Sequence, residues 1–249
     1  PLPLVLDQEA PQVLYTFDSS LRLYRSNDGG GSWQILATNL DPSFLFQTIS
    51  DVVGETGALF IGGVSQAATG LPQLFKSDAT GKNFVRIGTG LPADARIATI
   101  TVDPLDSNLV YVGVYGTGAV DQASLFRSVD GGLNFSPRLN LFSALGYQPD
   151  VQDLSFIAGT GASGSLFAVI NYNIYHSANG GATWTGPHGP AARITAHPSD
   201  ALKSYVGRAD GAFIWFAPNP MPNFLSFNEG FTPNSSYLSI PGNVPIRAA

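Results

Sequence analysis

One short polar motif recurs along the 249-residue chain at nearly even intervals, and this repeat limits the folds open to it. The first copy runs from Leu23 to Trp33 and reads Leu-Tyr-Arg-Ser-Asn-Asp-Gly-Gly-Gly-Ser-Trp. Related copies begin at residues 74, 125 and 174, so their serines, at 26, 77, 128 and 177, lie 51, 51 and 49 residues apart. A period near 50 residues is typical of folds in which each repeat forms one supersecondary unit.

The residues of the motif predict a compact hairpin turn. The side chain of Asp28 can accept hydrogen bonds from the backbone amides that follow it, which closes an Asx-type turn. Gly30 permits the positive φ that tight hairpins need, and Trp33 is expected to anchor the next strand in a core. The second copy has Ala79 at the aspartate position, so we expect a looser turn there. We assign this structural role to Ser26, Asp28, Gly30, Trp33, Ser128, Asp130, Gly132, Ser177, Asn179, Gly181 and Trp184.

These turns resemble the Asp-box, or bacterial neuraminidase repeat, of sialidase-like β-propellers, a superfamily that includes sortilin, xyloglucanases and photosystem assembly factors. The resemblance implies an all-β fold, a β-propeller in which each repeat is one blade of four antiparallel strands and the box joins the third strand to the fourth. We expect one domain over residues 1–249, with about five blades, near residues 1–40, 41–91, 92–142, 143–190 and 191–230.

The last residues leave the closure of the ring open. Propellers contain four to eight blades, so five are allowed. The segment 231–249, in which Tyr237–Ile240 reads as a strand, either closes a five-bladed ring or begins a further blade of a larger one. No stretch carries a sustained 3.6-residue apolar period, so we expect almost no helix.

Apolar alternation between turn residues places four strands in each blade. The expected strands are 4–6, 13–15, 21–25 and 33–36; then 46–49, 58–62, 74–76 and 84–87; then 97–102, 109–114, 125–127 and 135–138; then 154–157, 165–170, 174–176 and 183–185; and finally 193–196, 204–207, 213–216 and 224–227.

Composition excludes several kinds of function. A net charge of −6 and an isoelectric point near 4.8 argue against a surface for nucleic acid or an anionic membrane. No apolar run reaches the roughly 20 residues that span a bilayer, and the absence of Cys excludes disulfides and thiolate chemistry. Few Lys among many Gly, Ser, Thr and Asn are typical of exported bacterial β-proteins, so we predict a secreted, periplasmic or cell-surface location. The chain opens at Pro1 without a signal peptide, as a mature product or a trimmed chain would.

The order of strands in a blade separates two ends. Box turns share one end with the turns between first and second strands, and the opposite end is the one that propellers usually use for ligands. Sparse charges with Tyr and Asn among glycines there suit a carbohydrate or a partner protein, although ordinary solvated loops remain the alternative for any single residue. The predicted ligand-binding residues at this opposite end are Arg96, Asp121, Tyr147, Asn171, Tyr172, Arg193, Arg208 and Asp210.

The residues for catalysis are incomplete. The sialidase resemblance would imply three arginines around a substrate carboxylate, a Tyr activated by Glu, and an Asp acid/base. Arg96, Arg193 and Arg208 fall near the expected end and could bind a carboxylate. The chain has only three glutamates, however, and Glu9 and Glu55 map to the wrong end. We therefore assign no catalytic residue.

Other site chemistry has little support. A glycosidase needs two carboxylates about 5–9.5 Å apart, and the only pairs that can be named, Asp121 with Asp153 and Asp210 with Asp18, lie in no motif. Three scattered His without Cys do not predict zinc, and one box offers too few oxygen ligands for Ca²⁺. We predict neither metal nor cofactor.

These observations favour a non-catalytic binding or scaffolding module that contacts a protein or a glycan, with no nucleic-acid partner and no membrane insertion. The oligomeric state stays open. The alternative is a glycoside hydrolase of the sialidase-like superfamily. A third possibility is an assembly chaperone like the photosystem factors, but the sequence shows no basic patch of the kind they carry.

Overall fold

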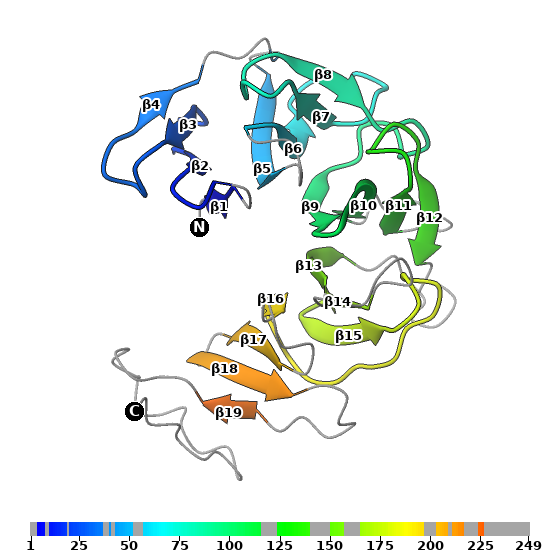
Figure 1. Ribbon diagram of the computed structural model, residues 1–249. Coiled ribbons are helices and arrows are strands. Elements are labelled where there is room, and N and C mark those ends of the chain that lie inside the picture. Colours follow the sequence, from blue (N-terminus) through cyan, green and yellow to red (C-terminus); the bar gives the residue numbers. More distant parts are fainter. Residues whose placement is uncertain are drawn as a thin grey trace. The chain divides into compact units, whose positions relative to one another are not determined.

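The structure is a computed structural model, and all the regular secondary structure that it describes is β (Figure 1). The described residues are 4–7, 10–18, 20–36, 40, 43–51, 57–115, 124–139, 150–156, 165–196, 203–208, 211–216 and 224–226. They form five small antiparallel sheets in chain order, with no helix among them. The predicted all-β class and the blade-by-blade order of strands are confirmed.

The chain divides into two compact units, Pro1–Val151 and Gln152–Ala249. The first unit holds three four-stranded sheets, each in the order of the sequence. Their strands are β1 (Leu4–Leu6), β2 (Leu14–Phe17), β3 (Leu23–Ser26) and β4 (Gln34–Ile35); β5 (Phe44–Asp51), β6 (Leu59–Ser65), β7 (Leu74–Ser77) and β8 (Phe84–Ile87); and β9 (Ile97–Asp103), β10 (Asp106–Val114), β11 (Leu125–Ser128) and β12 (Ser136–Leu139).

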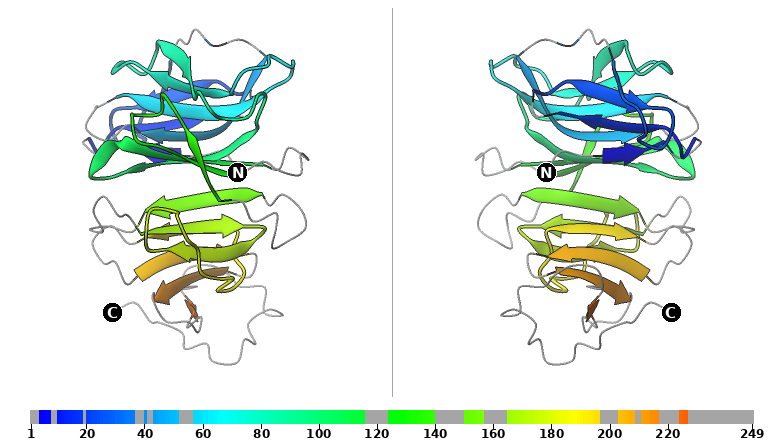
Figure 2. Two further views of the ribbon diagram at one scale, coloured as in Figure 1. Left: turned by 90° about the vertical axis from the view of Figure 1, so that its right-hand side faces the viewer. Right: turned by 90° about the vertical axis from the view of Figure 1, so that its left-hand side faces the viewer.

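The remaining strands form two sheets, whose antiparallel arrows lie side by side in both views of Figure 2. One has three strands and the other has four. The strands are β13 (Val151–Phe156), β14 (Leu166–Ile170) and β15 (Asn173–Ser177), and then β16 (Arg193–Ala196), β17 (Lys203–Arg208), β18 (Gly211–Phe216) and β19 (Phe224–Ser226). The predicted strand Tyr237–Ile240 lies outside the described residues, and the single-domain organisation and the closure of the ring stay predictions.

The strand expected at 183–185 is wrong. Only an isolated bridge between His176 and Thr185 stands in its place. The chain continues as Gly186-Pro187, and proline has no N–H with which to extend a ladder. The backbone pairs further along instead, because the N–H of His188 donates to the carbonyl of Ile174 at 2.9 Å.

Alternation along β6 explains how the first unit packs its sheets. Leu59 and Ile61 belong to a buried cluster with residues of the first sheet, such as Tyr15, whereas Phe60 between them belongs to a second cluster with Ile97 of the third sheet. Successive side chains of a strand point to opposite faces. A continuous apolar run therefore places β6 in the middle of two cores, and burying Phe60 fully contributes about 1.5–3 kcal/mol.

The second unit has the same kind of core between its two sheets. Phe167 and Val169 of β14 and Ile174 of β15 pack with Ile194 of β16 and Val206 of β17. The first strand of one sheet also bonds the first strand of the next, because Ser155 Oγ accepts a 2.8 Å hydrogen bond from the N–H of Ala196. This contact fixes β13 beside β16.

The polar turns between third and fourth strands share one hydrogen-bond pattern in three of the four copies. In the third copy, Ser128 Oγ accepts from the N–H of Gly132 at 2.9 Å and donates to Asp130 Oδ1 at 2.7 Å. Asp130 Oδ1 also accepts from the N–H of Asn134 at 2.9 Å. The serine is 1% exposed, so its hydroxyl supplies the acceptor that a buried amide needs. We call these segments, 26–33, 77–84, 128–135 and 177–184, the box turns.

The donors around each box carboxylate stabilise its charged form. The hydroxyl and N–H of Ser32 hold the pKa of Asp28 at about 2, and the N–H and side chain of Asn134 with the Ser128 hydroxyl hold the pKa of Asp130 at about 2. In the fourth copy Asn179 does the same structural work without charge, since its Oδ1 accepts from the N–H of Thr183 at 2.9 Å.

The sequence suggested a looser second box turn, because Ala79 stands at the aspartate position, but the structure shows a turn that is closed by hydrogen bonds. Asp78, one residue earlier than expected, accepts from the N–H of Thr80 at 2.9 Å and its hydroxyl at 2.6 Å, and also from the side chain of Asn83. These hydrogen bonds lower the pKa of Asp78. Ser77 consequently turns to the neighbouring strand, where its Oγ accepts from the N–H of Leu59 at 2.9 Å.

The aromatic residue at the end of the box turn is a core anchor in only some copies. Phe84 and Phe135 are buried, as expected. Trp33 is 38% exposed, so the expectation that it anchors a core is wrong. It precedes β4, a strand of two residues that are both exposed.

Candidate functional site

In each unit, the described residues that the sequence predicts to bind a ligand lie at the same end of their own sheet, which we call the loop end. It carries the turns between second and third strands and the segments that lead into the first strands. Arg96, Asn171, Tyr172, Arg193 and Arg208 are described there, in two different units. Asp121, Tyr147 and Asp210 lie outside the described residues. The described segments of the loop end are 18, 20–22, 66–73, 88–96, 115, 171–172 and 186–193, together with Arg208.

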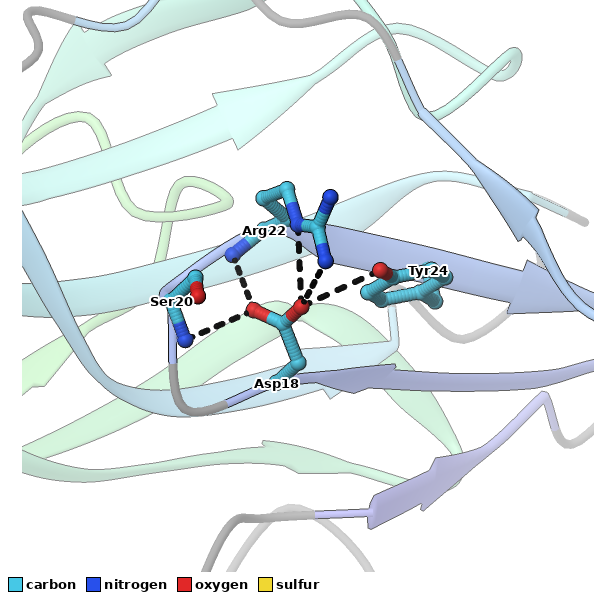
Figure 3. Close-up of polar contacts among 4 residues, drawn as sticks. All are labelled: Asp18, Ser20, Arg22 and Tyr24. Atoms are coloured by element: carbon cyan, nitrogen blue, oxygen red, sulfur yellow. Dashed lines mark hydrogen bonds and ion pairs between the residues drawn. The ribbon is translucent and has the colours of Figure 1, made fainter.

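In the first sheet the loop end is closed by an ion pair (Figure 3). Asp18 Oδ2 accepts from Nε and Nη2 of Arg22, at 2.9 and 2.6 Å, and from the hydroxyl of Tyr24 at 3.1 Å. Its other oxygen accepts from the N–H groups of Ser20 and Arg22. The backbone and guanidinium of Arg22 together hold the pKa of Asp18 at about 2. This carboxylate keeps its charge and closes the turn.

A second carboxylate at the loop end also closes a loop. Asp94 accepts from the N–H of Thr69 at 2.7 Å and its hydroxyl at 2.9 Å, and from the N–H of Gly70 at 3.0 Å. The segment before β9 is thereby joined to the turn between β6 and β7. The same backbone donors, that of Thr69 first, lower the pKa of Asp94. A carboxyl that is held ionised in this way cannot serve as a general acid near neutral pH.

Arg96 stands at the start of β9 and is held on two sides. Its guanidinium lies over the ring of Tyr115, with 4.4 Å between Cζ and the ring centroid, and Nη2 donates to Oε1 of Gln47 at 3.0 Å. Gln47 is the extra residue at a β-bulge in β5, since the register shifts between Phe46 and Thr48. Bulges redirect side chains. The bulge therefore supplies the hydrogen-bond partner of an exposed arginine.

In the second unit, Tyr172 and Arg193 both contact Gln152. The N–H of Tyr172 donates to Gln152 Oε1 at 3.2 Å, and Nη1 of Arg193 donates to the carbonyl of Gln152 at 3.2 Å. Gln152 itself is buried, whereas Arg193 and Tyr172 are exposed. The structure thus brings together three of the predicted residues, Asn171, Tyr172 and Arg193, around a glutamine that sequence reasoning missed.

Arg208 is placed by the register of β17. Arg193 pairs with Gly207, so Arg208 follows directly at the same end of the sheet and pairs with Gly211. The two arginines therefore share the loop end of the second unit.

Asp153, on β13, is the one carboxyl with a strongly raised pKa among the described residues. Burial raises the pKa of Asp153 to about 6, against the opposing effects of the Ile194 N–H and the charge of Arg193. Its Oδ2 accepts from the N–H of Ile194 at 2.8 Å, and Oδ1 accepts from the N–H of Leu154 at 3.1 Å. Like Ser155, it binds the backbone of β16.

The described residues form no metal-binding cluster and no membrane-spanning helix. Within those ranges no group of three or more His, Cys, Asp or Glu could hold a metal ion. His176 and His188 lie in the second unit, and burial lowers the pKa of each. In the same part of the chain no helix is long and apolar enough to cross a bilayer.

No known protein-family profile matches the chain. Among curated proteins, a xyloglucanase of Hypocrea jecorina is 28% identical over 135 residues, which cover 45% of this chain and 15% of that protein.

Solved structures resemble the chain over most of its length. An ancestral GH74 enzyme superposes with a TM-score of 0.64 at 18% identity and covers 93% of this chain and 31% of its own. The GH74 enzyme of Niastella koreensis gives 0.60 at 18%, over 89% and 38%. The structure "YCF48 bound to D1 peptide" gives 0.57 at 15%, over 90% and 66%. At these identities the likeness shows the β-propeller fold, and the chain spans less than two fifths of either GH74 structure.

Proposed function

We propose that this chain is a non-catalytic binding module of the Asp-box type, which holds a glycan or a protein partner at its loop end. One observation carries the proposal: the described carboxylates that close loops there, Asp18 and Asp94, are held ionised by their neighbours. The exposed groups at the loop end are a stacked arginine, Arg96, in the first unit and the pair Tyr172 and Arg193 in the second. Such groups can recognise a ligand, whereas Asp18 and Asp94, held ionised, cannot act as general acids for hydrolysis.

The comparisons support both kinds of partner. The neighbours include GH74 enzymes and a curated xyloglucanase, whose name indicates a glycan substrate, and YCF48, which was solved with a D1 peptide. From the composition we further propose a secreted, periplasmic or cell-surface location, and the module can form part of a longer assembly.

A glycoside hydrolase is the second candidate, and Asp153 is the observation in its favour. A carboxyl with a pKa of about 6 is protonated often enough near neutral pH to act as a general acid. Both of its oxygens, however, accept backbone hydrogen bonds, which favours a structural role.

Turnover of glycans separates the two candidates. We expect the full chain to release no reducing sugar from xyloglucan and no fluorophore from sialosides above the rate of an Asp153→Asn variant. A thermal melt of both proteins checks that the variant is folded. Hydrolysis by the natural chain that disappears in folded Asp153→Asn, or in Asp121→Asn, would replace the binding function by the catalytic one.

A further inference from the structure

The turn between β14 and β15 has a backbone conformation that does not suit one of its two residues. Ile170 pairs with Asn173, so the turn is Asn171-Tyr172 alone, with φ values of 47° and 60°. Two positive φ values define a type I′ turn, in which Asn-Gly is strongly preferred. Asn171 fits its position. A tyrosine in the left-handed region costs roughly 1–2 kcal/mol relative to ordinary backbone, so folding alone would favour glycine at 172.

The strained residue is also held firmly and displayed. Its N–H donates to Gln152 Oε1 at 3.2 Å, and its carbonyl accepts from the N–H of Ala191 at 2.8 Å. The residue as a whole is 65% exposed. The backbone is thus bound on both sides by neighbouring segments while the ring faces solvent, which reduces the entropy lost when a ligand packs on the ring.

The groups around Tyr172 are mostly neutral amides and one guanidinium. Asn171 precedes it, Asn173 follows it with Nδ2 bonded to the carbonyl of Asn171 at 3.0 Å, and Gln152 lies under its N–H. Arg193 reaches the same glutamine through the carbonyl. Amide and guanidinium groups bind hydroxyl oxygens by hydrogen bonds.

We propose that Tyr172 is the stacking platform for a sugar ring of a neutral polysaccharide, with Arg193 as the hydrogen-bond donor beside it. One face of a pyranose ring presents C–H groups, which carry partial positive charge and pack on the electron-rich face of a phenol ring. The hydroxyls at the rim of the sugar need donors such as guanidinium. This inference rests on the binding function proposed above and names its ligand and its central residue.

The substitution Tyr172→Gly separates binding from folding. Because glycine suits the turn, we expect the variant to melt at the same temperature as the natural chain or up to about 4 °C higher. We expect its affinity for hydroxyethylcellulose, measured by affinity electrophoresis of the full chain, to fall at least tenfold. Tyr172→Phe keeps the ring and should stay within about threefold.

A control variant completes the test. Tyr205→Thr removes another exposed tyrosine of the same unit, from strand β17. It is expected to bind hydroxyethylcellulose like the natural chain. Charged polygalacturonate in the gel should retard the natural chain less than the neutral polymer does.

Different failures lead to different conclusions. If the natural chain ignores neutral polysaccharides, or if Tyr172→Gly binds them equally well, the stacking platform is wrong. Retention by a proline-rich or other peptide that Tyr172→Gly abolishes would also overturn the sugar ligand, and the binding function would survive with a protein partner. Only hydrolysis of the polymer would remove the binding function itself.

Discussion

Replacing Gly63 by alanine is expected to lower the free energy of unfolding by about 3 kcal/mol or more, the range of severe core changes. A Cβ at this position would lie 1.9 Å from the carbonyl oxygen of Leu45 and 3.0 Å from Cζ of Phe44. The nearer atom belongs to the backbone of the paired strand and cannot rotate away. The ladder between β5 and β6 must therefore open.

The same glycine sets the geometry of Arg96. Gly63 pairs with Phe46 and Gly62 pairs with Thr48, so Gln47 between them bulges out and reaches the guanidinium. Urea denaturation of the natural chain and Gly63→Ala measures the loss. Gly207→Ala is the matched control. Gly207 also lies within a strand, but a Cβ there would meet no atom nearer than Cβ of Arg193, at 3.7 Å. Equal and small losses in the two variants would contradict the close approach at Gly63.

Ser128→Ala is expected to destabilise the chain by about 2 kcal/mol. The hydroxyl of Ser128 is the acceptor for the N–H groups of Asp130 and Gly132, and it donates to the Asp130 carboxylate. Removing one partner of a buried donor costs about 1–3 kcal/mol. The pKa of Asp130 should also rise from about 2 toward its ordinary value, since one of its donors is lost.

Denaturant midpoints and a carboxyl-carbon NMR titration measure both effects. Ser136→Ala, at an exposed position at the start of β12, serves as the control and should change stability by less than about 0.5 kcal/mol. If Ser128→Ala is as stable as Ser136→Ala, the hydrogen bonds of the box serine do not stabilise the turn.

Much of the fold could be predicted from local patterns. Strands such as Phe84–Ile87 and Arg193–Ala196 match their expected bounds, because apolar alternation and the box spacing mark them. The failures arise where tertiary contacts decide. Asp78 replaces the missing aspartate from a neighbouring position, and the strand expected at 183–185 ends against Gly186-Pro187.

The candidate site was harder to predict, and for physical reasons. Gln47 and Gln152 carry no local signal, since a glutamine in a strand reads as an ordinary solvated position. One acts through a bulge and the other through partners 20 and 41 residues away in sequence. The left-handed backbone of Tyr172 is equally hidden, because Asn-Tyr is not a recognised turn pair. The sequence could place Arg96, Tyr172 and Arg193 at the loop end, but it could not predict which side chains they contact there.

Amide hydrogen exchange with and without a bound polysaccharide tests most directly whether the loop end is the working surface. We expect added protection at residues 171–173 and 189–193 and none at the box turns 26–33, 128–135 and 177–184. Protection confined to the box turns would contradict the choice of surface, and binding without protection at either end would contradict the account as a whole.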